Sequence, residues 1–264
     1  MKPGPNTTAI YVFCITAGGP VCAAVGLHPL RPVHSLVWED LVAVVSQVPL
    51  EEFGEEALPA RLEDVCWLEK EVRGHERVVE KVMEGRAVLP MKFCTVFRTE
   101  DRVRTLLESR KEEFRRLLAR LREKEEWEVK MYFEPPAAAA PRTAAQARAC
   151  LSGREFLLKR KAEDLEAWEA MNEAHQQAQR SLEEVSGYLE GIQLKPLPPQ
   201  DSSWGPKLIL DVACLLAKPR LKAFSQQLEG LGNELSSRGF HFQLTGPWPP
   251  YHFCNQTPEN DDLS

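Results

Sequence analysis

The stretch VCWLEKEVRGHERVVEKVMEGRAVLPMKFCTVF (residues 65–97) decides the fold class, because it joins a helix directly to a strand. In its first part, side chains recur at steps of three and four, which predicts one packed helix face that ends at Gly85. The residues on this face are Val65, Leu68, Val72, His75, Val79 and Val82. The second part, residues 88–97, predicts a strand, and Pro90 places it near a strand start or a sheet edge.

Strands are predicted on both sides of this stretch. Residues 9–17 (AIYVFCITA) form an apolar run that ends at a Gly-Gly-Pro turn, and residues 34–40 and 41–48 predict a strand pair. Downstream, residues 103–121 predict an amphipathic helix, and residues 126–133 alternate as a half-buried strand. The pattern favours an α+β N-terminal domain of ferredoxin-like type over residues 1–134, with its helices on one face of the sheet.

The second half of the chain predicts another α+β domain. The Pro- and Ala-rich residues 135–142 are typical of a linker, so we expect the C-terminal domain at residues 143–254 and a disordered tail at 255–264. In this domain we expect one long helix or a helical pair from residue 154 to about 189, with a thin apolar stripe that includes Trp168. After a loop at 195–207 we expect a strand from residue 207, a helix from Pro219 and a strand at 240–244.

Composition limits the classes of partner. The 264 residues carry a net charge of −6, so binding nucleic acid would need a basic patch that works against the overall field. The 7 cysteines are scattered and several lie in apolar runs, which indicates reduced thiols in a cytoplasmic protein. No apolar run approaches the roughly 20 residues that span a bilayer. We therefore expect a soluble protein with neither a membrane span nor a nucleic-acid partner.

The usual catalytic and nucleotide-binding motifs are absent from the sequence. Cysteines and histidines lack the spacing of a local zinc site, so we expect no cofactor, no metal and no enzymatic activity. His75 is the one ionisable residue in its apolar stripe, and two interpretations are open. It is either a general base or ligand, or a core histidine whose ring nitrogens bond nearby groups, which we favour.

The segment GPWPPYHF (residues 246–253) is the most unusual local sequence. Its three prolines fix the backbone, and its aromatic side chains offer large rigid apolar surfaces. These aromatics either pack as a lid on the C-terminal core or project as anchors for a partner. For any single aromatic we favour packing, because large side chains are mostly buried in folded domains.

Four segments in this order make the chain resemble the gas vesicle protein GvpF/GvpL family. They are residues 67–97, EWEVKMYF (126–133), SGREFLLKRKAED (152–164) and GFHFQLTGPWPPYHF (239–253). The residues that the resemblance marks as structural are His75, Pro90, Phe93, Phe97, Trp127, Lys130, Gly246 and Pro247. Two positions depart from the family pattern: Cys94 stands where a small residue, often Gly, is expected, and His252 where Ser is expected.

The resemblance implies a non-enzymatic, gas-vesicle-associated role in assembling these hollow protein shells. Its partners would be the shell protein GvpA and other accessory Gvp proteins. As candidate partner-binding residues we take first Trp248, Pro249, Pro250, Tyr251 and Phe253, and then Trp168. Two alternatives remain: a small-molecule-binding regulatory protein or uncharacterised enzyme on a ferredoxin-like scaffold, and a protein that only bridges other accessory proteins.

Overall fold

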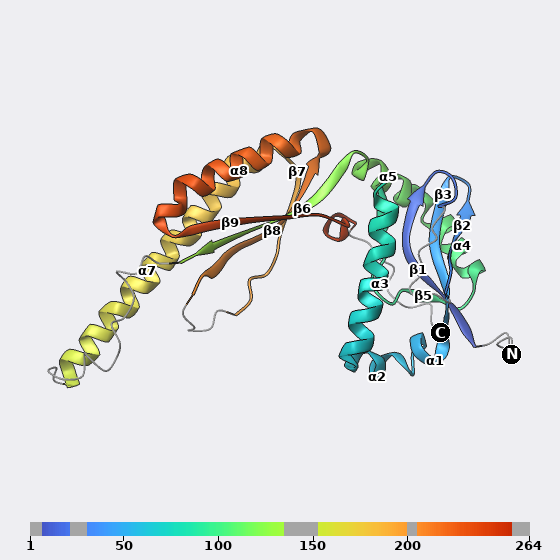
Figure 1. Cartoon of the computed structure of the whole chain (residues 1–264), viewed down its shortest axis with the longest axis horizontal. Coiled ribbons are helices and arrows are strands. Elements are labelled where there is room, and N and C mark those ends of the chain that lie inside the picture. Colours follow the sequence, from blue (N-terminus) through green and yellow to red (C-terminus); the bar gives the residue numbers. More distant parts are fainter. Residues whose placement is uncertain (1–6, 22–30, 135–152, 200–204, 255–264) are drawn as a thin grey trace. The chain divides into compact units, whose positions relative to one another are not determined.

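The chain forms two compact units. The structure is a computed structural model that describes residues 7–21, 31–134, 153–199 and 205–254 (Figure 1). The first unit contains Met1–Glu125 and Pro247–Ser264, and the second contains Glu126–Gly246. The chain therefore passes into the second unit within strand β6 and returns within strand β9. The linker expected at 135–142 and the tail expected at 255–264 lie outside the described residues.

The first unit is built on an antiparallel sheet with the strand order β2-β3-β1-β4, in which β5 also pairs with β1. The strands are β1 (Thr8–Ala17), β2 (Val33–Trp38), β3 (Leu41–Pro49), β4 (Val88–Pro90) and β5 (Val96–Phe97). Strand β1 is antiparallel to both β3 and β4, so β3 and β4 run parallel on either side of it, but β1, β2 and β3 follow one another with no helix between them. The α+β class is confirmed, whereas the ferredoxin-like connectivity expected for this unit is not.

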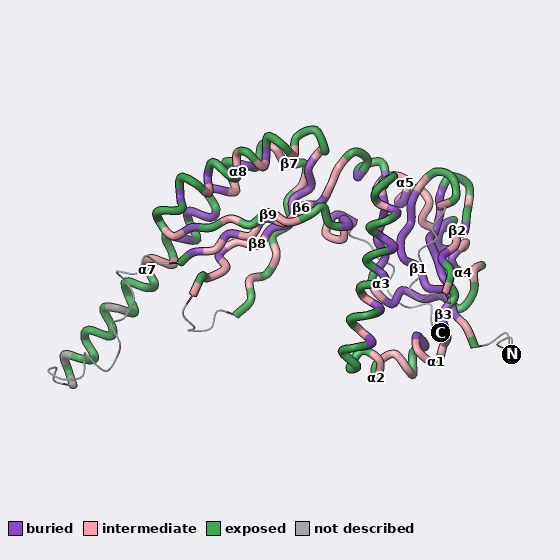
Figure 2. The backbone as a smooth tube through the Cα atoms, viewed as in Figure 1, coloured by how far each residue is buried: buried purple, intermediate pink, exposed green. Residues whose placement is uncertain are grey.

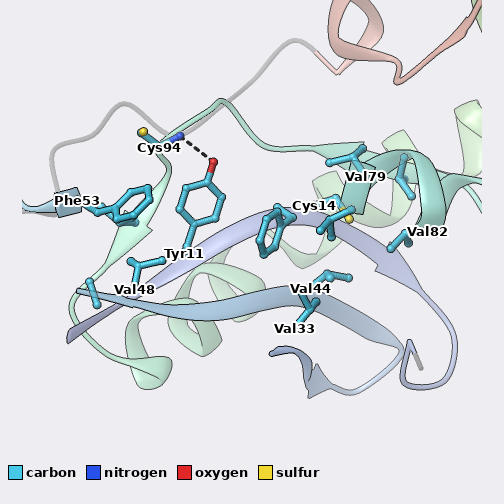
Figure 3. Packing of buried hydrophobic residues seen from close by; sticks show 14 of the residues in the cluster. Tyr11, Cys14, Val33, Val44, Val48, Phe53, Val79, Val82 and Cys94 are labelled. Carbon is cyan, nitrogen blue, oxygen red and sulfur yellow. Dashed lines mark hydrogen bonds between the residues drawn. The ribbon is translucent and has the colours of Figure 1, made fainter. Parts of the chain in front are cut away.

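Helices cover both faces of this sheet. They are α1 (Leu50–Phe53), α2 (Leu58–Glu63), α3 (Val65–Met83), α4 (Glu100–Ser109) and α5 (Lys111–Leu121). On one face, Tyr11 and Phe13 of β1 pack in a cluster with Val79 of α3 (Figure 3). Ile10 and Val12 are equally buried but lie outside that cluster, where α4 and α5 contact the strands. The expectation of helices on a single face was wrong, and the continuous apolar run of β1 is the pattern of a strand covered on both sides.

Two predicted elements of this unit are interrupted. The strand expected at 88–97 divides into β4 and β5, because residues 91–95 form a turn in which Thr95 N–H donates to the Lys92 carbonyl. The helix expected at 103–121 divides into α4 and α5 at Arg110, whose φ of −112° and ψ of 18° are not helical. The short helices α1 and α2 were not predicted.

The backbone conformation at Cys94 explains why the family pattern has a small residue, often glycine, at this position. Its φ is 63°, in the left-handed region where a Cβ atom is strained and glycine is not. The backbone N–H of Cys94 donates a hydrogen bond of 3.1 Å to the hydroxyl of Tyr11, so the turn must keep this conformation. A glycine is expected there because only glycine adopts this backbone without strain.

We predict that Cys94→Gly is more stable than Cys94→Ala by about 1 kcal/mol, since both remove the thiol but only glycine relieves the positive φ. The matched control is Cys14, which is buried in strand β1 and does not have a positive φ. There the order should reverse, with Cys14→Gly less stable than Cys14→Ala by about 1 kcal/mol. Urea denaturation of the four variants measures both differences, and the same sign at the two positions would contradict the prediction.

The second unit has a four-stranded sheet with two helices on one face. Its elements are β6 (Lys124–Phe133), α7 (Gly153–Ser186), β7 (Leu189–Leu194), β8 (Lys207–Ala217), α8 (Leu221–Leu235) and β9 (Phe240–Trp248), with 3₁₀ turns η2 (Lys218–Arg220) and η3 (Ser236–Arg238). The strand order is β7-β8-β6-β9. Together with the element order β-α-β-β-α-β, this is the arrangement of the split βαβ motif. The strand at 126–133, expected to close the N-terminal domain, therefore belongs to this sheet.

The core of the second unit lies between the sheet and both helices. Val129 and Met131 of β6 point to this side, where Phe224 of α8 and Ala178 of α7 are buried. Strand β7 was not predicted, because its Glu190, Gly191 and Gln193 hide the alternation and most of its residues are exposed. None of the helices in the described part has both the length and the apolarity needed to cross a bilayer.

Gly246 and Trp127, two residues marked by the family resemblance, meet in this unit. Gly246 has a φ of 141°, and a Cβ atom there would lie 3.0 Å from the Trp127 ring and 3.1 Å from the Glu126 carbonyl oxygen. The glycine thus lets β9 approach β6 closely beside a large side chain. Trp127 in turn packs against the core of the sheet.

Gly246→Ala should destabilise the protein by about 2 kcal/mol or more, through the positive φ and the contact with Trp127. Gly230, an exposed residue of α8 with open space where a Cβ would be, provides the control. Gly230→Ala should stabilise by up to about 1 kcal/mol, because alanine is the better helix former. Thermal unfolding of the two variants tests the pair, and an unchanged midpoint for Gly246→Ala would refute the steric account.

Candidate functional site

The segment that follows β9 packs as part of the first unit. Pro249 and Pro250 are buried, and Phe253, in the 3₁₀ turn η4 (Tyr251–Phe253), is 6% exposed. Trp248 is the exception, with 43% of its surface exposed. The expectation that these aromatics cover the C-terminal core was wrong: the segment packs in the unit that contains α3 and β1.

His75 connects this segment to the sheet. Its Nδ1 lies 2.9 Å from the hydroxyl of Tyr11, and its Nε2 lies 2.9 Å from the hydroxyl of Tyr251. Because the Cys94 amide already donates to the Tyr11 oxygen, the Tyr11 hydroxyl can donate to Nδ1, and the Nε2 proton can go to Tyr251. A neutral imidazole satisfies all of these hydrogen bonds. Residues more than 170 positions apart are thereby joined through one side chain.

Burial sets the protonation state of the side chains in and around this hydrogen-bonded chain. Removal from water lowers the pKa of His75 to about 4, although a hydrogen bond with the Met91 backbone opposes the shift. Burial likewise raises the pKa of Tyr11 and Tyr251 and raises that of the Cys94 thiol to about 12. All four groups are therefore neutral at pH 7.

A charged group lies one helical turn before His75. Glu71 is 1% exposed, and its Oε1 lies 3.5 Å from Nη2 of Arg31 and 3.7 Å from Nζ of Lys70. Arg31 also lies 3.6 Å from Glu52, and its guanidinium lies over the ring of Phe53. This buried ion pair holds the chain at Arg31 against α3.

The surroundings of His75 favour packing over catalysis. Its imidazole is 2% exposed and lies among the rings of Tyr11, Phe13 and Phe93. Both ring nitrogens have hydrogen-bond partners, so neither is open to a substrate or metal. Within the described residues, no group of three or more His, Cys, Asp or Glu side chains is arranged to hold a metal ion.

We predict that His75 makes the first unit sensitive to mild acid. The folded-state pKa of about 4 lies below the ordinary value, so the unfolded state binds more protons as the pH falls from about 6.5 to 4. At pH 5 the free energy of unfolding should be lower than at pH 7 by on the order of 2 kcal/mol from this group. Urea denaturation of wild type and His75→Gln at the two pH values measures the effect.

His75→Gln should lose most of that pH dependence, because glutamine does not titrate. His241→Gln, at an exposed histidine on β9, is the control and should keep the pH dependence of the wild type. An equal drop between pH 7 and pH 5 in wild type and His75→Gln would show that other groups cause it.

The other residues marked by the family resemblance lie in both units. In the first, Pro90 ends β4 opposite Cys14, Phe97 is buried in β5, and Phe93 packs against Trp67. Pro247 is exposed. Sequence reasoning missed Tyr11, although a tyrosine in a strand buried on both faces needs a partner for its hydroxyl, and that signal was available.

Lys130 belongs to a charge cluster in the second unit. Its Nζ lies 3.1 Å from Glu128 and 3.9 Å from Asp211, and Lys195 makes ion pairs with the same two carboxylates. Burial alone would raise the pKa of Glu128, but hydrogen bonds from Lys195 and Lys130 outweigh it and hold that pKa at about 2. The cluster links β6, β8 and the end of β7 through charges of both signs.

The second candidate surface lies on α7. Trp168 is 65% exposed, and it is accompanied by other exposed apolar side chains in the first half of the helix. Of the six candidate partner-binding residues, only Trp168 and Trp248 thus have large exposed surfaces, whereas Pro249, Pro250 and Phe253 are buried and Tyr251 is bonded to His75.

Comparisons with known sequences agree on one family. A model of the family described as gas vesicle synthesis protein GvpL/GvpF matches residues 9–255. Gas vesicle protein L of Streptomyces sp. (strain CB03234) is 34% identical over 259 residues, which cover 95% of this chain and 94% of that protein. Gas vesicle protein F of the same strain is 26% identical over 236 residues, covering 85% and 89%.

Solved structures share the fold. The crystal structure of the gas vesicle protein GvpF from Anabaena sp. PCC7120 matches with a TM-score of 0.68 at 19% identity, over 95% of this chain and 100% of that one. GvpF from Microcystis aeruginosa matches with a TM-score of 0.63 at 19% identity, over 94% and 99%. At these identities the likeness concerns the fold alone.

Proposed function

This chain belongs to the GvpL/GvpF family of gas vesicle synthesis proteins, and from that premise we propose that it is a non-enzymatic assembly factor that binds the shell protein GvpA. It would act in the cytoplasm and at the growing vesicle, together with other accessory Gvp proteins. Binding would keep the shell protein from aggregating before it is incorporated.

The physical need for such a factor follows from the shell. A wall that keeps liquid water out of a gas space must present a strongly apolar face, and that face drives aggregation while the subunit is free. A protein that covers part of the face reversibly would keep the subunit in solution until it reaches the shell. Moderate affinity suffices, because the subunit must later be released.

The observation that supports the proposal is that Trp248 is exposed while the residues that follow it are held in place. Its side chain is 43% exposed, while the next two residues, Pro249 and Pro250, are buried and Tyr251 is bonded to His75. An exposed tryptophan on a fixed backbone loses little conformational entropy when it binds. Such residues are common anchors of protein interfaces.

We predict that Trp248→Ala weakens binding to the shell protein by about 2 kcal/mol, or roughly 30-fold, with little loss of stability. The measurement is the amount of freshly diluted GvpA-type subunit that stays in the supernatant after centrifugation in the presence of increasing amounts of this protein. An unrelated acidic protein of equal mass gives the baseline. Retention above the baseline that falls sharply for Trp248→Ala is the expected result.

The matched control is Trp168→Ala, which removes a more exposed tryptophan on α7, 65% exposed against 43% for Trp248. It should retain the shell protein as the wild type does. Loss of retention with Trp168→Ala alone would move the binding surface to α7. If the wild type retains no shell protein in the supernatant, the proposed function is contradicted. Bridging between accessory proteins is then the next hypothesis.

A further inference from the structure

The first half of α7 carries an exposed apolar stripe. The exposed fractions are 67% for Leu157, 59% for Leu158, 54% for Leu165 and 65% for Trp168. Figure 2 shows this half of the helix as exposed, whereas the second half packs on the sheet of the same unit through Ala174, Ala178 and Val185. With Phe156, which is 39% exposed, five large apolar side chains on one short length of helix form a surface suited to a partner.

The spacing of this stripe is that of a helix–helix seam. Arg154, Leu158, Lys161, Leu165 and Trp168 follow one another at steps of four, three, four and three residues. This is the heptad spacing that brings side chains to one line along a helix and against a second helix. The aliphatic stems of the arginine and the lysine can pack in such a seam while their charges reach its edge.

The charges along the seam are divided by sign. The cations Arg154 and Lys161 lie on it in the first half, and the carboxylates Asp164 and Glu169 flank it further along. A parallel pair of identical helices would place like charges together. An antiparallel pair places the cations of each helix beside the carboxylates of the other, because it reverses one sequence against the other.

We propose that two copies of this chain associate through an antiparallel, two-fold symmetric pairing of the first halves of their α7 helices. In the register that this symmetry favours, Leu158 lies opposite Trp168 of the partner subunit, and Lys161 lies beside Asp164 of the partner subunit. The same patch serves on both copies, as a two-fold interface requires. The inference concerns a different surface from Trp248 and does not depend on shell-protein binding.

Other occupants fit the stripe less well. Residues 135–152 contain one large aliphatic residue, Leu151, and residues 255–264 contain one, Leu263, so neither segment offers apolar side chains at helical spacing. A helix from another accessory protein would need the complementary order of charges, which a second copy supplies by itself.

Sedimentation velocity of the full-length protein over a range of concentrations tests the pairing. The wild type should form a dimer that weakens as salt is added. One double variant, Arg154→Glu with Lys161→Glu, and another, Asp164→Lys with Glu169→Lys, should each dimerise at least tenfold more weakly, because like charges then meet. Mixed in equal amounts, the two variants should associate with each other at least as tightly as the wild type does.

Lys222→Glu with Glu229→Lys, at exposed positions of α8, is the control and should leave the dimer unchanged. All of these positions are exposed, and circular dichroism verifies that each variant keeps its helix content. A wild type that stays monomeric at all concentrations overturns the proposal. So does a dimer that both double variants form normally, or a mixture of the two that fails to associate. Retention of the shell protein is measured separately, so either idea can fail alone.

Discussion

The first unit depends on the hydrogen bonds of one buried histidine. His75 holds Tyr11 of the central strand through one ring nitrogen and Tyr251 of the C-terminal segment through the other. Tyr11 in turn accepts the amide of Cys94, which fixes the turn between β4 and β5. The hydrogen bonds of His75 and Tyr11 thus connect α3, β1, the turn between β4 and β5, and the C-terminal segment. An imidazole suits this place because it is neutral here and offers one donor and one acceptor in opposite directions.

These hydrogen bonds also explain how a segment held by three buried residues, Pro249, Pro250 and Phe253, presents an exposed tryptophan. Pro249, Pro250 and Phe253 are buried in the first unit, and the hydrogen bond with His75 fixes Tyr251 between them. Trp248 stands just before this fixed stretch, so its backbone is set by neighbours that do not depend on any partner. Packing therefore accounts for Pro249, Pro250 and Phe253, and the exposed Trp248 is the residue to which the proposed anchor role is assigned.

Sequence reasoning located most elements but assigned some of them to the wrong neighbours. The runs that became β1, α3 and β8 have strong periodicity or length, and each was predicted. Strand β6 was also predicted, yet its pairing partners β8 and β9 lie far along the chain, and no local pattern identifies them. For the site, the spacing around His75 favoured a core histidine over a general base or ligand, whereas its hydrogen bond with Tyr251 depends on a contact between distant segments. At Cys94, the sequence showed only that the family pattern has glycine there, and the positive φ that explains it came from the structure.

Trp248 and Trp168, the two exposed tryptophans among the described residues, differ in what surrounds them, and their proposed roles follow from that difference. Trp248 is a single aromatic on a rigid support, whereas Trp168 belongs to a seam with leucines at heptad spacing and with charges of opposite sign in its two halves. A single rigid anchor can bind many apolar faces, because little of its surroundings must match. A charged seam is selective, since each pair of like charges brought together opposes binding. In the two proposals taken together, one chain would recognise an apolar shell subunit with one surface and its own copy with the other, without competition between them.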